Sequence, residues 1–88
     1  MAERKPKHSL DHDVFGRTVR VFRARKGLSQ EELGFRAKLH RNYVGAIERG
    51  EINLTLRVLL KLHRGLDVPL SELITDYENQ LIKWTRSR

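Results

Sequence analysis

The chain has 88 residues, of which 39% are apolar and 33% are charged, so it is long enough for one compact domain and too short for two. It contains no cysteine, which excludes disulfides, thiolate nucleophiles and cysteine-based zinc sites. No apolar run approaches the ~18 residues of a membrane-spanning helix, and the N-terminus lacks the apolar core of a signal peptide, so we expect a cytoplasmic protein.

The formal net charge of +7 and the pI of about 10.4 favour a polyanionic partner, such as DNA, RNA or an acidic membrane. The charge is uneven, because residues 1–50 contain 12 Lys and Arg against 6 Asp and Glu, whereas residues 51–88 contain 6 against 5. Basic side chains could also serve only to keep a small domain in solution, and composition leaves both interpretations open. A core of this size is marginal, so we also expect an oligomer.

Residues 1–13 are predicted to be a flexible basic tail, because they contain Pro6 and few apolar residues. His8 and His12 have a spacing that could hold a metal ion on one face of a helix. No third strong ligand lies nearby, so we predict no metal site, and no cofactor elsewhere in the chain.

Helical periodicity begins at Val14, and the first predicted helix ends at Gly27 with the apolar face Phe15, Val19 and Phe22. Ser29 and Glu32 have the spacing of a capping box, which predicts a second, short helix that ends near Lys38. Its inward residues are Leu33 and Ala37.

Three further helices are predicted in the second half of the chain. The third spans residues 41–49 with Val44 and Ile47 inward, and it ends before Gly50. Thr55 can cap the fourth, whose predicted buried stripe is Leu56, Leu59, Leu60, Leu62 and Leu66. The fifth opens at Pro69 or Ser71, with Leu70, Leu73, Ile74 and Tyr77 on one side. The predicted fold class is therefore all-α, with five helices and short connections.

Gly34 stands inside the second predicted helix, where glycine costs roughly 1 kcal/mol relative to alanine. A missing side chain would let the next helix cross closely, with Leu33, Ala37, Leu39, Val44 and Ile47 filling the space between the two. Two short helices that meet at a tight turn in this way have the packing of a helix-turn-helix.

Four stretches match the pattern of a known protein family, and they occur in the same order as in that family: FGRTVRVFRARKGLSQEEL, YVGAIERG, TLRVLLKL and GLDVPLSELI. On these motifs, residues 15–74 resemble the Cro/cI-type helix-turn-helix family, also called the xenobiotic response element family. The resemblance implies a lambda-repressor-like, five-helix DNA-binding domain over residues 14–74, followed by a helical extension over residues 75–88.

The resemblance also implies roles for particular residues. Helix 41–49 would enter the major groove, where the residues facing base edges would be Arg41, Asn42, Gly45 and Ala46. Contacts to the DNA backbone would come from Gln30, His40, Tyr43 and Asn53, and Gln30 would also brace the recognition helix. Arg23 and Glu48 match a pair that the family uses as an internal salt bridge, so we interpret Glu48 as structural.

Two positions depart from the family pattern. Lys38 stands where the turn usually has glycine, and a left-handed conformation there would be unfavourable for lysine, although its ammonium could reach a phosphate. His63 replaces a small residue that the family tends to bury. Either His63 is partly exposed, or the fourth helix packs differently.

Residues 75–88 contain a helical stripe of Tyr77, Leu81 and Trp84, spaced by four and three residues. The stripe could fold back on the chain's own core or pair with a second copy. We predict a homodimer whose contact residues are Leu70, Ile74, Tyr77, Leu81 and Trp84. Twofold symmetry would place two recognition helices roughly 34 Å apart, as successive major grooves require.

These observations predict a sequence-specific, DNA-binding transcriptional regulator that binds an inverted-repeat operator as a homodimer and blocks or recruits polymerase. The alternative is an antitoxin-like interaction module, whose C-terminal stripe covers a protein partner and whose DNA binding serves autoregulation. We predict no enzymatic activity, because neither a nucleophile–base spacing nor a phosphate-binding loop is present.

Overall fold

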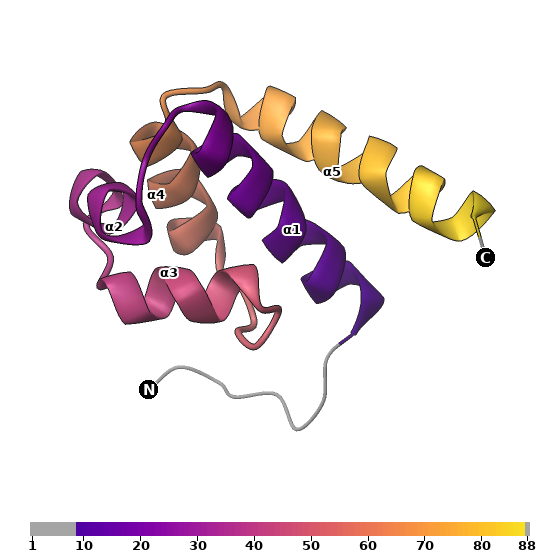
Figure 1. Cartoon of the computed structure of the whole chain (residues 1–88), viewed down its shortest axis with the longest axis horizontal. Helices are drawn as coiled ribbons and strands as arrows, with labels where there is room; N and C mark the ends of the chain where they lie inside the picture. Colours follow the sequence, from indigo (N-terminus) through magenta and orange to yellow (C-terminus); the bar gives the residue numbers. More distant parts are fainter. Residues whose placement is uncertain (1–8, 88) are drawn as a thin grey trace.

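The computed structural model describes residues 9–87, and these residues form five α-helices (Figure 1). The helices are α1 (Leu10–Arg25), α2 (Gln30–Ala37), α3 (Arg41–Glu48), α4 (Leu56–Leu66) and α5 (Leu70–Arg86). The predicted all-α fold with short connections is confirmed. None of the helices in residues 9–87 is long and apolar enough to cross a membrane.

Side-chain caps set the starts of two helices where the sequence predicted them. The Ser29 hydroxyl accepts a hydrogen bond from the Glu32 amide at 2.9 Å, and the Glu32 carboxylate accepts one from the Ser29 amide at 2.8 Å. The bond from the Ser29 amide, and after it the nearby Ser29 side chain, hold the pKa of the Glu32 carboxyl below its usual value. Thr55 caps α4 by accepting from the Val58 amide at 3.2 Å.

The first helix begins earlier than predicted. Ser9 caps it by accepting a hydrogen bond from the His12 amide at 3.2 Å, and two acidic residues, Asp11 and Asp13, complement the positive end of the helix dipole. The prediction of a tail through residue 13 is therefore wrong for residues 10–13. Residues 1–8 of that tail, and with them His8 of the predicted His8 and His12 pair, lie outside the described residues.

One hydrophobic core is shared by all five helices, with α2 packed against α3 and α4, and α1 packed against α3 and α5. The side chains at its centre are fully buried: Val19, Leu33, Val44, Ile47, Leu62, Leu66 and Leu73. The predicted inward faces of the first three helices are confirmed by this arrangement.

The predicted buried stripe of α4 needs one correction. Leu56 is 66% exposed, whereas Val58, which the prediction omitted, is 9% exposed and belongs to the core. Residues two positions apart on an α-helix point about 200° away from each other. A helix that turns Val58 inward must therefore turn Leu56 outward. On α2, Phe35 is 86% exposed.

The last helix is continuous from Leu70 through the predicted extension, and it runs beside α1 before diverging from it (Figure 1). The rings of Tyr77 and Phe15 meet edge to face at 5.9 Å, and the Tyr77 hydroxyl donates to the Asp11 carboxylate at 2.7 Å. Burial and this carboxylate raise the pKa of Tyr77 to about 12. Within the single chain, the extension therefore packs along α1.

His63 is partly exposed, which is one of the two outcomes that the sequence left open. Its Nδ1 lies 2.9 Å from the Val68 carbonyl oxygen, and because that oxygen only accepts, Nδ1 carries the proton. The ring thus joins the end of α4 to the loop that leads into α5.

Candidate nucleic-acid interface

The turn between α2 and α3 is tight because Gly34 has no side chain. A Cβ atom at Gly34 would lie 2.5 Å from the Leu39 carbonyl oxygen, a distance that real Cβ atoms do not tolerate. Lys38 ends α2 with φ 59° and ψ 44°, so it adopts the left-handed conformation that the family usually gives to glycine. Lys38 therefore takes the backbone conformation that glycine would take in this turn, and it carries the conformational strain.

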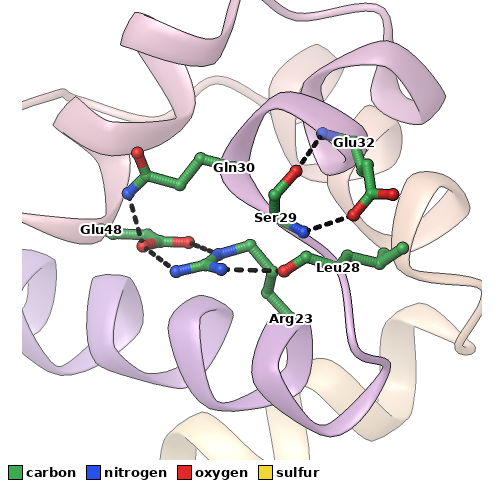
Figure 2. Close-up of polar contacts among 6 residues, drawn as sticks. All are labelled: Arg23, Leu28, Ser29, Gln30, Glu32 and Glu48. Carbon is green, nitrogen blue, oxygen red and sulfur yellow. Dashed lines mark hydrogen bonds and ion pairs between the residues drawn. The ribbon is translucent and has the colours of Figure 1, made fainter.

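A buried carboxylate fixes α3 against α1 and α2 (Figure 2). Glu48, whose side chain is 4% exposed, accepts hydrogen bonds from Arg23 Nε at 2.6 Å and from Arg23 Nη2 at 3.0 Å. A third guanidinium nitrogen, Nη1, donates to the Leu28 carbonyl at 2.9 Å. The hydrogen bonds to Glu48 raise the pKa of Arg23 above its ordinary value. The Glu48 carboxylate thus binds groups within the protein and holds α3 in place.

Gln30 joins the same network from the first turn of α2. Its side-chain nitrogen donates to Glu48 Oε1 at 3.0 Å (Figure 2). Gly45 lies beneath this amide, because a Cβ there would approach the Gln30 side chain at 3.4 Å and Arg49 Nη1 at 3.1 Å. Gly45 is buried. Its missing side chain leaves room for the Gln30 and Arg49 side chains above it.

The first turn of α3 presents exposed polar side chains. Arg41 and Asn42 are both exposed, and Arg41 forms only a loose ion pair with Glu31, at 3.6 Å. His40 is also exposed and caps the helix, since its Nδ1 accepts from the Asn42 amide at 3.0 Å. An Nδ1 that accepts leaves Nε2 as the protonated nitrogen, and Nε2 can then donate to an anion.

The remaining predicted contact residues differ in exposure. Lys38 and Asn53 are exposed, on the turns before and after α3. Tyr43 and Ala46 are half-buried and pack against the core. Part of the Tyr43 side chain therefore packs against the core and part stays exposed.

Sequence reasoning treated Arg49 only as the end of the third helix. Arg49 is exposed, follows Gly45 by one helical turn, and is held by Glu51 through bonds of 3.0 and 3.2 Å. The hydrogen bonds that Arg49 donates to Glu51 raise the pKa of Arg49 above its ordinary value. Its spacing of four residues from Gly45 and eight from Arg41 was the available signal, since these spacings share a helix face.

Comparison with known proteins agrees with this geometry. The family model described as Helix-turn-helix matches residues 19–73, which is more than half of the chain. The chain belongs to the Cro/cI-type helix-turn-helix family. Among proteins similar to it, control protein C.SmaI of Serratia marcescens is 38% identical over 63 residues, covering 72% of this chain and 75% of that protein. Control protein C.BamHI of Bacillus amyloliquefaciens is 40% identical over 62 residues, covering 69% and 76%.

Solved structures of Cro/cI-type proteins have the same fold. The restriction-modification controller protein C.AhdI from Aeromonas hydrophila superimposes with a TM-score of 0.72 at 46% sequence identity, covering 74% of this chain and 98% of that one. The controller protein C.Esp1396I gives a TM-score of 0.82 at 28% identity, covering 86% and 99%. This Cro/cI-type protein is thus a DNA-binding transcriptional regulator.

Proposed function

We propose that the protein recognises a specific operator by inserting α3 into the major groove of DNA. The observation that carries the proposal is the exposed first turn of α3, where Arg41 and Asn42 stand on a helix fixed by Glu48. A guanidinium can bond O6 and N7 of guanine, and an amide can bond N6 and N7 of adenine. Ala46 would contact a thymine methyl group, and Gly45 would leave the space that Gln30 and Arg49 occupy above it.

Around this reading surface, five residues would hold the DNA backbone: Gln30, Lys38, His40, Tyr43 and Asn53. The ammonium of Lys38 and the free ring nitrogen of His40 are donors, as phosphate oxygens require. Arg49 would join them on the far side of α3. Contacts of this kind set the register of α3 and contribute most of the salt dependence of binding.

We further propose that the protein binds an inverted repeat as a homodimer. At about 100° per residue, Leu70, Ile74 and Leu81 share one stripe of α5, and all three are half-buried in the single chain. Tyr77 and Trp84 lie about 20° and 40° from Leu70, at the edge of this stripe that meets α1, where Tyr77 contacts Phe15 and Trp84 contacts Arg17. The proposed dimer contact is therefore the narrower stripe of Leu70, Ile74 and Leu81.

The names of the similar chains suggest the regulated target. Four of the proteins described above are control or controller proteins, and C.AhdI and C.Esp1396I are named as restriction-modification controllers. We propose that this protein likewise controls transcription of a restriction–modification system. Mapping its operator onto the source genome tests this proposal, which fails if the operator lies away from such genes.

The central test is selection from a randomised duplex library at about 0.15 M salt, where binding through phosphates alone is weak. We expect enrichment of an inverted repeat. In Arg41→Ala, preference at one base position in each half-site should fall by about 1–3 kcal/mol. Arg57→Ala, an exposed arginine on α4, is the matched control and should keep the full preference. No enrichment with wild-type protein would refute sequence reading.

Dimerisation is tested separately by sedimentation equilibrium. Leu81→Asp places a charge on the proposed stripe, and Ile82→Asp places one on a neighbouring residue that is 50% exposed. We expect only Leu81→Asp to produce monomers and weaken operator binding. Equal dimerisation of the two variants would show that another surface joins the protomers.

A further inference from the structure

A groove of about 980 Å³ lies between α1 and the C-terminal half of α5, on a side of α5 that the proposed dimer does not use. Its α5 wall contains Trp84, Gln80 and Lys83, which lie about 60°, 100° and 160° around the helix from the centre of the dimer stripe. Toward its C-terminal end α5 diverges from α1 (Figure 1), and the groove lies between these diverging parts of the two helices.

The shape of the groove suits a third helix. The α1 residues that line the groove recur every three or four positions from Leu10 to Ala24. They span about 21 Å at 1.5 Å per residue. The exposed apolar side chains are Leu10 on the α1 wall, at 38%, and Trp84 on α5, at 39%, whereas Val14 beneath them is buried. Two diverging helices that expose apolar side chains form a trough into which the apolar face of another helix packs.

The charge of the groove specifies what kind of helix would bind. Arg17, Arg20 and Lys83 line it, and within residues 9–87 none of the three forms an ion pair with a carboxylate. Arg17 also stacks over the Trp84 ring at 6.0 Å. The two acidic residues in the lining are not free, because Glu48 binds Arg23 and Asp13 has another partner. The groove therefore has a cationic rim around an apolar floor.

We propose that this groove binds an acidic amphipathic helix of a partner protein. The partner's apolar face would cover the floor, and its carboxylates would pair with Arg17, Arg20 and Lys83. The C-terminal half of a second copy's α5 carries Lys83 and Arg86 and would be repelled. The proposal does not depend on sequence-specific DNA binding.

The test uses the fluorescence of Trp84, which is the only tryptophan in the chain and lines the groove. The full-length protein is titrated with a capped 18-residue helical peptide of leucine and glutamate that lacks aromatic residues, and with a matched leucine–lysine peptide. We expect a saturable blue shift with the acidic peptide and none with the basic one. The absence of a shift, or equal shifts with the two peptides, would refute the proposal.

Matched variants separate the groove from general charge attraction. Arg20→Glu with Lys83→Glu changes both walls but leaves the Arg17–Trp84 contact intact, and it should weaken peptide binding at least about tenfold. Arg36→Glu with Arg57→Glu makes the same change in net charge on exposed surfaces of α2 and α4, and should retain more of the affinity. Equal weakening would reduce the effect to net charge and overturn the proposal, provided that thermal melts show both variants folded.

Two further outcomes would also overturn it. A blue shift that grows with protein concentration in the absence of peptide would show that a second copy fills the groove. A saturable shift with dodecanoate but not with the acidic peptide would identify a site for a small anionic amphiphile instead. Operator binding is measured on the same variants, so that a failure of the groove proposal is distinguishable from a failure of the DNA-binding proposal.

Discussion

The α2–turn–α3 unit and helix α5 are both amphipathic segments on one core, but they are held in place very differently. The first is fixed by a capping box, a buried carboxylate with three side-chain hydrogen bonds, and a close backbone contact at Gly34. Beyond Tyr77, α5 exposes Ile82 and part of Trp84, and Trp84 meets α1 through the Arg17 guanidinium. A surface that reads bases must hold its donors rigidly, whereas a surface that meets a protein can leave apolar area open.

Removing the carboxylate at the centre of the rigid unit should have the largest effect. Glu48→Ala leaves Arg23 partly buried without its partner, so we expect a loss of about 3 kcal/mol in the free energy of unfolding. Urea denaturation measures this loss. Glu51→Ala removes the carboxylate of an exposed pair and should cost less than about 1 kcal/mol. Similar losses in the two variants would contradict the assignment of Glu48 as the anchor of α3.

The close contact in the turn gives the next largest effect. In Gly34→Ala the new methyl group would collide with the Leu39 carbonyl, which should destabilise the fold by about 1–3 kcal/mol, although alanine is the better helix former. Thermal unfolding provides the measurement. Phe35→Ala, at the neighbouring exposed position, is the control and should change stability by no more than about 0.5 kcal/mol. A stabilised Gly34→Ala variant would mean that the turn has room to spare.

On α5, the corresponding change is Tyr77→Phe, which removes the hydrogen bond to Asp11 and should cost about 1 kcal/mol. Hydrogen exchange should then increase mainly in the C-terminal turns of α5, while α2 and α3 stay protected. Faster exchange throughout the chain would show that α5 and the helix-turn-helix unit open together.

The same tyrosine predicts a dependence of stability on pH. Folding raises the pKa of Tyr77 from about 10 to about 12 because the folded state favours the neutral phenol. The associated stability is complete below pH 10 and is lost as the pH rises toward 12. Stability measured across this range should decrease in the wild type, and the part due to Tyr77 should be missing in Tyr77→Phe. Identical pH profiles would contradict this assignment.

The smallest expected effect is a gain. Lys38→Gly relieves a left-handed lysine and should stabilise the protein by about 0.5–1 kcal/mol, while operator affinity falls because a proposed phosphate contact is lost. Asp67→Gly is the matched control, since Asp67 has the same positive φ at the end of α4. It should give the same gain without weakening DNA binding. If both variants bind DNA equally well, Lys38 does not contact the backbone.

Local spacing in the sequence was sufficient for features that depend on neighbours along the chain. Ser29 and Glu32 form their capping box, Thr55 caps α4, and Gly34 allows the tight turn, because each of these interactions joins residues no more than five positions apart. Ser9 belongs to the same class, and its cap was overlooked because the residues before it are rich in charge.

Features that depend on distant segments were decided only by the tertiary structure. Leu56 and Leu81 are both leucines on amphipathic helices, but the rotation of each helix against its neighbours determines how far each is buried. Trp84 turns toward α1 because Tyr77 is held by Phe15 and Asp11, residues more than sixty positions away. A helix presents its side chains at a fixed spacing, so sequence determines the stripes. Which stripe meets the core, and which remains free for DNA or a partner, follows from how all five helices pack together.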